Sequence, residues 1–366
     1  MQTTQKRGPL ARTIAETPTD IWNDSCAVDE LEYAIDFGAV GATANPTIVV
    51  DVWNKDPGHW ADRVRVLAVE QPRWSEIELA WAVVEEMSVR GAALLAPTFE
   101  AQGGRKGRLS VQTDPTLFRS AERMVAQAAH FNTIAPNIIV KFPATAAGIS
   151  AIEEATVQGV SINATVSFSV AQAIAAAEAV ERGLTRREAA GERTDAMGPV
   201  ITLMMGRLED WLRVLADRGG VIVHPSALPW SGIAVFKRAY DVFRERGFRA
   251  RLLGAAIRHH LHWSELIGGD VIITLPSAWQ KRFNASSVEV RPRIDEPVDP
   301  AFVDELRLRL PDFERAFEPD GLRVDEFETF PPSARTLRTF VASYHDLLHL
   351  VNDALVPNPD LRSIVT

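Results

Sequence analysis

A lysine lies inside a segment whose composition is otherwise that of a buried strand. Residues 138–142 read Ile-Ile-Val-Lys-Phe and leave no polar face around Lys141, which is typical of a parallel strand covered on both sides. Because burial disfavours the ammonium form, such a lysine has a lowered pKa, and its neutral amine can attack a ketone or an aldehyde. An edge-strand lysine that reaches solvent is the alternative.

The residues after this lysine indicate where it lies in the fold. Pro143 ends the strand, and Thr145 is a good N-cap for a helix that passes through Gly148 and Ile152. A lysine at the C-terminal end of a strand that leads into a helix occupies the position where barrel enzymes keep catalytic groups.

The rest of the chain supplies the elements of such a barrel. Short apolar runs alternate with helical patterns such as 31–37, 115–130, 169–182 and 207–218. The predicted strands are 20–23, 41–44, 108–112, 138–142, 161–166, 200–205, 251–255 and 271–275. Eight such units predict a closed (β/α)8 barrel, the TIM-barrel fold. The alternative, an open doubly wound sheet, would carry a glycine-rich phosphate turn after its first strand, and this sequence has none.

Some segments fall outside the alternation. Residues 75–99 predict a helical insertion between the second and third strands, and the Gly-Gly-Arg-Lys-Gly-Arg sequence at 103–108 predicts an exposed turn, since its spacing is not that of a P-loop. Residues 302–317 and 333–353 predict helices. We expect one domain over 1–366, with the barrel at about 20–285 and a C-terminal helical cover at about 286–366.

Composition excludes several functional classes. A net charge of −9 argues against nucleic acid as a main partner. The single cysteine, Cys26, excludes an internal disulfide framework and fits a reducing compartment. The sequence has neither a signal-peptide pattern nor an apolar run of membrane-spanning length. We therefore expect a cytoplasmic protein without a membrane partner, and a homo-oligomer remains open.

Polar residues gather at the C-terminal ends of the predicted strands, where a barrel brings them over one pocket. A carboxylate near the lysine, amides and hydroxyls that hold a water, and two arginines for an anion form a coherent set for aldol chemistry. These residues are Asp24, Asn45, Gln112, Lys141, Asn163, Thr165, Thr202, Arg207 and Arg258.

Three segments together resemble the transaldolase family. Residues 38–47 (GAVGATANPT), 140–145 (VKFPAT) and 162–173 (INATVSFSVAQA) are similar to that family's signatures, and the similarity runs from about Asp20 to Pro276. The resemblance implies a (β/α)8 barrel. It also implies class I, cofactor-free transfer of a dihydroxyacetone unit from a ketose phosphate to an aldose phosphate, as in the pentose phosphate pathway.

The resemblance also implies a role for each site residue. Lys141 would form the Schiff base, Asp24 would be the general acid and base, and Gln112 with Thr165 would position a water. The sugar would contact Asn45, Asn163, Ser169 and Thr202, and its phosphate would contact Arg207 and Arg258.

The sequence departs from the family pattern at three places. Gln112 stands where transaldolases have a glutamate, and glutamine cannot exchange a proton at neutral pH. Fructose-6-phosphate aldolases have glutamine there with a tyrosine on strand six, but this sequence has Met204 at the tyrosine position. Ala256 replaces a phosphate-binding serine. Two alternatives therefore stay open: an aldolase that releases dihydroxyacetone, and a sugar-phosphate-binding protein without catalysis.

Two groups of histidines could bind a metal, and Asp24 could cap a helix instead of acting in catalysis. His345 and His349 have metal-ligand spacing on a helix, but no acidic third ligand accompanies them. The Arg-His-His-Leu-His run at 258–262 is interpreted as the lining of a helix start, so we expect no metal. For Asp24, the alternative is the N-cap of the helix that follows.

Overall fold

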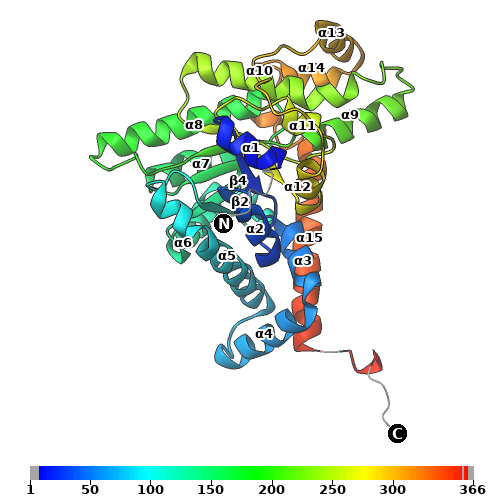
Figure 1. Ribbon diagram of the computed structural model, residues 1–366. Helices are drawn as coiled ribbons and strands as arrows, with labels where there is room; N and C mark the ends of the chain where they lie inside the picture. Colours follow the sequence, from blue (N-terminus) through cyan, green and yellow to red (C-terminus); the bar gives the residue numbers. More distant parts are fainter. Residues whose placement is uncertain (1–7, 357, 362–366) are drawn as a thin grey trace, which may run out of the picture.

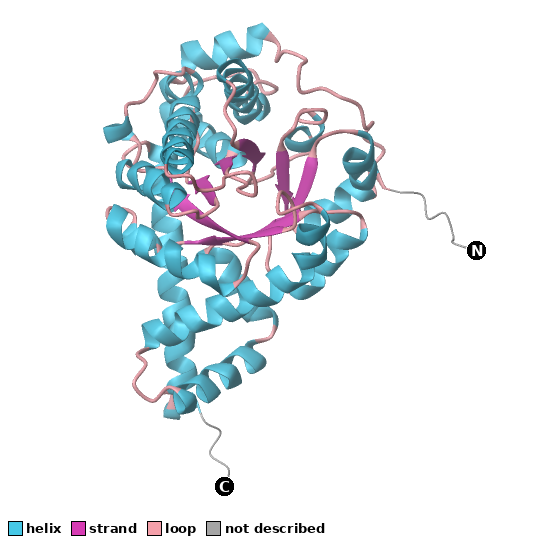
Figure 2. Ribbon diagram, turned by 90° about the vertical axis from the view of Figure 1, so that its left-hand side faces the viewer, coloured by secondary structure: helices cyan, strands magenta, loops and turns pink. Residues whose placement is uncertain are grey.

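Eight parallel strands close into a barrel in the computed structural model, which describes residues 8–356 and 358–361. The strands follow one another in chain order, and β8 returns to pair with β1. Figure 2 shows them inside a ring of helices. They are β1 (Asp20–Asn23), β2 (Gly41–Thr43), β3 (Arg108–Gln112), β4 (Ile138–Pro143), β5 (Ile162–Thr165), β6 (Val200–Leu203), β7 (Arg251–Gly254) and β8 (Ile272–Leu275). The predicted barrel and its eight strands are confirmed.

Along the chain, helix α1 precedes the first strand, and the other helices lie between and after the strands (Figure 1). Up to β6 they are α1 (Pro9–Glu16), α2 (Val28–Asp36), α3 (Pro46–Lys55), α4 (Pro57–Glu70), α5 (Glu76–Ala101), α6 (Ala121–Ile134), α7 (Ala146–Val157) and α8 (Val170–Ala189). After β6 follow α9 (Met205–Gly219), α10 (Ser231–Arg246), α11 (Leu261–Ser264), α12 (Ser277–Asn284), α13 (Pro300–Arg309), α14 (Pro311–Phe317) and α15 (Pro331–Leu355). None of the described helices is long and apolar enough to cross a membrane.

The register of the strands places the polar residues in one layer of the barrel. Gln112 pairs with Lys141, and Lys141 pairs with Asn163 across three neighbouring strands. A separate apolar cluster contains Trp22, Ile139, Val200, Leu253 and Ile272. Four of these residues stand two positions before Asp24, Lys141, Thr202 and Thr274 in the sequence. Since side chains two residues apart on a strand face the same side, the interior is apolar at its N-terminal end and polar at its C-terminal end.

Two predicted helical segments differ from the structure. The 75–99 segment is helical, but its helix α5 contacts β3 and α2 and so is the barrel's own connection; α3 and α4 are the added helices. The 302–317 segment is two helices, because Pro311 lacks an amide N–H and disfavours helical backbone at the preceding residue.

Helix α15 returns from the C-terminal part of the chain to the barrel. It lies beside α3 and α4, as Figure 1 shows, and also contacts α5 and α9. Leu337, Phe340 and Leu347 are buried on its inner side, and the hydroxyls of Thr47 and Ser343 are 2.9 Å apart. The start of α15 also lies next to the start of α9, at the polar end of the barrel.

Candidate active site

Lys141 is buried in the polar layer. It is 5% exposed, and its Nζ donates a hydrogen bond of 3.1 Å to the carbonyl of Ala44. Burial lowers the pKa of Lys141 to about 8; Asp24 opposes this shift and Arg207 reinforces it. Because a closed barrel has no edge strand, the edge-strand alternative is wrong. A much larger fraction of this amine than of an ordinary lysine is therefore neutral and nucleophilic near neutral pH.

Asp24 directly follows β1 and is held by a hydroxyl chain. The Thr43 hydroxyl donates to Asp24 Oδ1 at 2.6 Å, and Thr43 Oγ1 lies 2.9 Å from Thr274 Oγ1. A carboxylate only accepts, so Thr43 uses its proton on Asp24 and Thr274 donates to Thr43. The N-cap of α2 is Ala27, so the N-cap alternative for Asp24 is wrong.

Gln112 presents a buried acceptor without a partner. Its side chain is 5% exposed, and its Oε1 accepts no hydrogen bond from any described residue. The Oγ of Ser167, just after β5, is also buried and unpaired among these residues. Such atoms are costly unless a ligand or water satisfies them. Sequence reasoning missed Ser167, although it stands two residues after Thr165.

Asn163 and Thr202 are joined in a buried network. The Thr202 hydroxyl donates to Asn163 Oδ1 at 2.8 Å, and Asn163 Nδ2 donates to Ser110 Oγ at 3.0 Å. These contacts fix which way the Asn163 amide points. Sequence reasoning also missed Ser110, whose signal is its place two residues before Gln112 on the same face of β3.

Two of the expected sugar ligands serve as helix caps. The Asn45 side chain accepts from Ile48 N at 3.1 Å and begins α3, which leaves its amide nitrogen for other partners. Ser169 begins α8: its hydroxyl accepts from Gln172 N at 3.1 Å and donates to Gln172 Oε1 at 3.2 Å. The Ser169 proton is thus already used by Gln172, so we do not carry Ser169 forward as a sugar ligand.

Thr165 ends β5 beside a strained residue. It is 1% exposed and pairs in register with Pro143. The next residue, Val166, has a φ of 51°, which is rare for a β-branched side chain. The buried Gln172 amide holds it by donating to Val166 O at 3.2 Å and to Ser333 Oγ of α15 at 3.2 Å. The strain therefore lies next to a predicted catalytic residue and is tied to α15.

Arg207 and Arg258 meet at a small cavity of about 170 Å³, together with Arg335 and Thr336 of α15. Arg207 Nη1 is 3.4 Å from Thr336 Oγ1. Burial, and then Arg258, lower the pKa of Arg207. Arg258 pairs with Asp210 through Nη2 at 2.7 Å, whereas no described carboxylate forms an ion pair with Arg207. The cavity is suited to an anion such as a phosphate.

Gly206 allows the two arginines to approach. A Cβ at this position would lie 1.8 Å from the carbonyl oxygen of Ala256. Ala256 itself has a φ of 62°. The absence of a side chain at Gly206 thus lets the start of α9 lie directly against the loop that carries Arg258.

Glu209, His259 and His262 bring their ligand atoms within 4.8 Å of one another. Sequence reasoning missed Glu209 as a partner of these histidines. His262 Nδ1 accepts from Arg258 N at 3.2 Å, and burial keeps the pKa of His262 well below 6.5. A neutral His262 then carries its proton on Nε2, which lies 3.5 Å from Glu209 Oε2. The nitrogen facing the cluster therefore has no lone pair for a metal.

The family model described as Transaldolase/Fructose-6-phosphate aldolase matches residues 21–348. The chain belongs to this family. The match begins in β1 and ends within α15, so it includes Asp24, Lys141 and both arginines of the small cavity.

Individual transaldolases of this family are also similar. The transaldolase of Thiobacillus denitrificans is 28% identical over 324 residues, which cover 80% of this chain and 88% of that protein. Transaldolase 1 of Streptomyces avermitilis is 30% identical, over 56% of this chain and 54% of its own length. The transaldolase of Thermobifida fusca is 30% identical, over 55% of this chain and 56% of its own length. The chain thus spans little more than half of the last two relatives.

Proposed function

We propose that the protein transfers a dihydroxyacetone unit from a ketose phosphate to an aldose phosphate through an imine on Lys141. The observation that carries this proposal is the buried lysine itself, with its pKa lowered to about 8. The Asp24 carboxylate and the two arginines Arg207 and Arg258 would then account for proton transfer and for phosphate binding.

The reaction begins when the neutral Lys141 amine attacks the C2 carbonyl of the ketose. Loss of water gives an imine, whose positive charge can accept an electron pair. Asp24 removes the proton from the C4 hydroxyl, the C3–C4 bond breaks, and its electron pair enters the imine to form an enamine. An aldose phosphate leaves, and the three-carbon enamine stays bound to Lys141 until an acceptor aldehyde arrives.

The polar layer would assist these steps. The unpaired Oε1 of Gln112 can accept a hydrogen bond from the water that enters or leaves during imine formation, and Thr165 would hold the same water. Asn163 and Thr202, fixed by their own hydrogen bonds, and the Asn45 amide nitrogen would meet the sugar hydroxyls.

The second candidate is a lyase that releases free dihydroxyacetone. Gln112 favours it, because fructose-6-phosphate aldolases resemble this sequence at that position. Met204, 7% exposed at the start of α9, offers no hydroxyl where those aldolases have a tyrosine. The absence of that hydroxyl favours the transferase.

A product assay separates the two candidates. The protein is given fructose 6-phosphate with and without an aldose phosphate acceptor. The transferase releases at most one equivalent of glyceraldehyde 3-phosphate per active site without the acceptor and turns over only with it, whereas the lyase turns over equally in both conditions and forms free dihydroxyacetone. No product under either condition would leave the protein as a sugar-phosphate binder.

The covalent step has its own test. Borohydride added with substrate should trap a sugar adduct on the peptide that contains Lys141, and Lys141→Ala should abolish both trapping and turnover in a folded protein. An adduct on Lys106 or Lys237 instead would refute the assignment.

Four further expectations stay predictions. They are a cytoplasmic location, a single domain, the absence of a metal or cofactor, and the absence of a nucleic-acid partner; a homo-oligomer stays open.

A further inference from the structure

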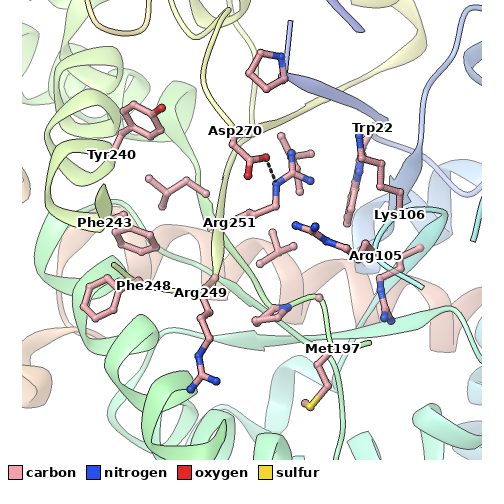
Figure 3. A pocket seen from close by; sticks show the side chains of 18 of the residues that line it. Trp22, Arg105, Lys106, Met197, Tyr240, Phe243, Phe248, Arg249, Arg251 and Asp270 are labelled. Atoms are coloured by element: carbon pink, nitrogen blue, oxygen red, sulfur yellow. Dashed lines mark ion pairs between the residues drawn. The ribbon is translucent and has the colours of Figure 1, made fainter. Parts of the chain in front are cut away.

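A second cavity, of about 710 Å³, lies at the other end of the barrel (Figure 3). Its lining includes the starts of four strands at Arg108, Val200, Arg251 and Ile272. Lys141 and the small phosphate cavity lie at the C-terminal ends of the strands. The mechanism proposed above uses no residue of this second cavity, whose volume is within the range of small-molecule sites.

One wall is formed by the glycine-rich turn between α5 and β3. Gly103, Gly104 and Gly107 have φ values of 58°, 85° and 76°, which fold the turn back on itself. The prediction of an exposed turn at 103–108 is wrong in part: Arg105 is exposed, but Gly104, Gly107 and Arg108 are buried. The turn therefore places a buried arginine at the edge of the cavity.

Arg108 has no carboxylate partner among the described residues, although its guanidinium lies over the Phe99 ring at 5.1 Å. Arg108 is 4% exposed, and it donates to two carbonyls, Gly104 O at 2.9 Å and Ala196 O at 2.6 Å. Neither Arg108 nor Arg105 forms an ion pair with any described carboxylate. The pKa of Arg108 is lowered to about 10 by burial alone. A buried cation without a counter-charge is costly, and an anion in the cavity would offset that cost.

The neighbouring basic groups, in contrast, are already paired. Buried Asp20 accepts from Lys106 Nζ at 2.8 Å and from Arg251 Nη1 at 2.7 Å. Arg251 also pairs with Asp270 at 2.8 Å, as the dashed line in Figure 3 shows. The uncompensated positive charge is thus confined to the wall that carries Arg105 and Arg108.

The opposite wall is aromatic. Tyr240, Phe243 and Phe248 line it, and in Figure 3 they lie across the cavity from Arg105 and Lys106. The Phe243 and Phe248 rings pack edge to face with centroids 5.1 Å apart. The indole of Trp22 lies on the basic side, so a flat group could contact rings while an anionic group meets the arginines.

We propose that this cavity binds a small organic phosphate with a planar ring, of the size of a mononucleotide. Its phosphate would lie between Arg105 and Arg108, whose guanidinium groups match phosphate oxygens. Its ring would lie against Phe243 and Phe248. This site is separate from the sugar-phosphate cavity at Arg207 and Arg258.

Calorimetric titration of the full chain with AMP tests this proposal. AMP should bind, and Arg105→Ala should weaken binding about tenfold or more, the usual effect of losing a charge-assisted hydrogen bond. Arg105 is exposed and unpaired among the described residues, so its removal should leave the fold intact. Arg218→Ala, an exposed arginine on α9 outside the cavity, is the matched control and should change nothing.

Further variants locate the site and define its ligand. Arg258→Ala should leave AMP binding unchanged. In the Arg258→Ala variant, adenosine and ribose 5-phosphate should each bind more weakly than AMP. Adding Phe248→Ala to that variant should lower its affinity for AMP. The proposal is overturned if AMP fails to bind at millimolar concentration. It is also overturned if Arg258→Ala rather than Arg105→Ala removes binding, since AMP would then occupy the sugar-phosphate cavity.

Discussion

The burial of Lys141 links its chemistry to pH. Its pKa is lowered from 10.5 to about 8, so the nucleophilic neutral form becomes dominant as the pH rises through about 8. We predict that imine formation accelerates with pH up to that point and then levels off. The rate of borohydride-trapped adduct formation in single turnovers, measured from pH 6 to 10, checks this. A rate that keeps rising up to pH 10 would contradict the lowered pKa.

The same shift affects stability. Between the folded pKa of about 8 and the unfolded value of 10.5, the unfolded chain binds the proton that the folded chain has lost. The contribution of Lys141 to the free energy of unfolding therefore increases with pH in this window, and the destabilisation is fully present below it.

Gln112 stands where the sequence pattern of transaldolases has a glutamate, so its effect on Lys141 can be tested by restoring the carboxylate. Gln112→Glu would place a carboxylate beside Lys141 and so favour the ammonium form. We predict that the midpoint of the pH profile moves upward by about one unit or more. Gln112→Leu, which adds no charge, should leave the midpoint in place while slowing imine formation. If both variants keep the midpoint, the glutamate is protonated or points away from the lysine.

Asp24 is expected to act after the imine has formed. Asp24→Asn should still allow trapping but slow carbon–carbon cleavage by about 10²–10⁴-fold, as is typical for a lost general acid or base. Mass spectrometry of the reduced protein should show an intact six-carbon adduct that accumulates. Unchanged turnover would remove Asp24 from the mechanism.

The sequence could indicate which residues belong to the site, but it could not show every structural role that these residues have. The lysine was recognisable because Ile138, Ile139, Val140 and Phe142 left it no solvent-facing side. The second task of Asn45 as a helix cap, and the full use of the Ser169 hydroxyl by Gln172, depend on backbone geometry that types and spacing do not contain.

At the scale of elements, α15 supplies part of the proposed phosphate site. Arg335 is exposed, lies over the Trp211 ring and lines the same cavity as Arg207. We predict that Arg335→Ala raises KM for phosphorylated substrates several-fold with little change in kcat, because a solvent-exposed charge contact is worth about 1 kcal/mol or less. Arg338→Ala, three residues further along the exposed side, is the matched control. Equal effects from both variants would indicate general destabilisation.

Element prediction succeeded where periodicity was strong and failed where tertiary contacts decide. Each of the eight strands was located because an apolar run is bounded by polar or turn residues. The 75–99 helix was misassigned as an insertion because its sequence pattern does not show which of the consecutive helices α3, α4 and α5 connects β2 to β3. Only the contact of α5 with β3 and α2 settles which one is.

At the scale of the whole molecule, Cys26 can report unfolding. It is 2% exposed, and burial raises the pKa of its thiol to about 12. At pH 8 its thiolate fraction in the folded chain should be on the order of 10³-fold below that of an unfolded cysteine. We predict correspondingly slow reaction with a disulfide reagent such as DTNB, and rapid, stoichiometric reaction in denaturant. Rapid labelling of the native protein would mean that the segment after β1 opens locally.

The placement of α15 has a consequence for synthesis. Ribosomes make the barrel strands and Lys141 long before they reach Pro331, yet Arg335 and Thr336 of the proposed phosphate site belong to the last long helix. A nascent chain released before that helix would carry the reactive lysine without a complete anchor for its substrate. Tight binding of a sugar phosphate would then be a property of chains whose translation has run to the end of α15, and chains stalled earlier would bind phosphorylated substrates more weakly.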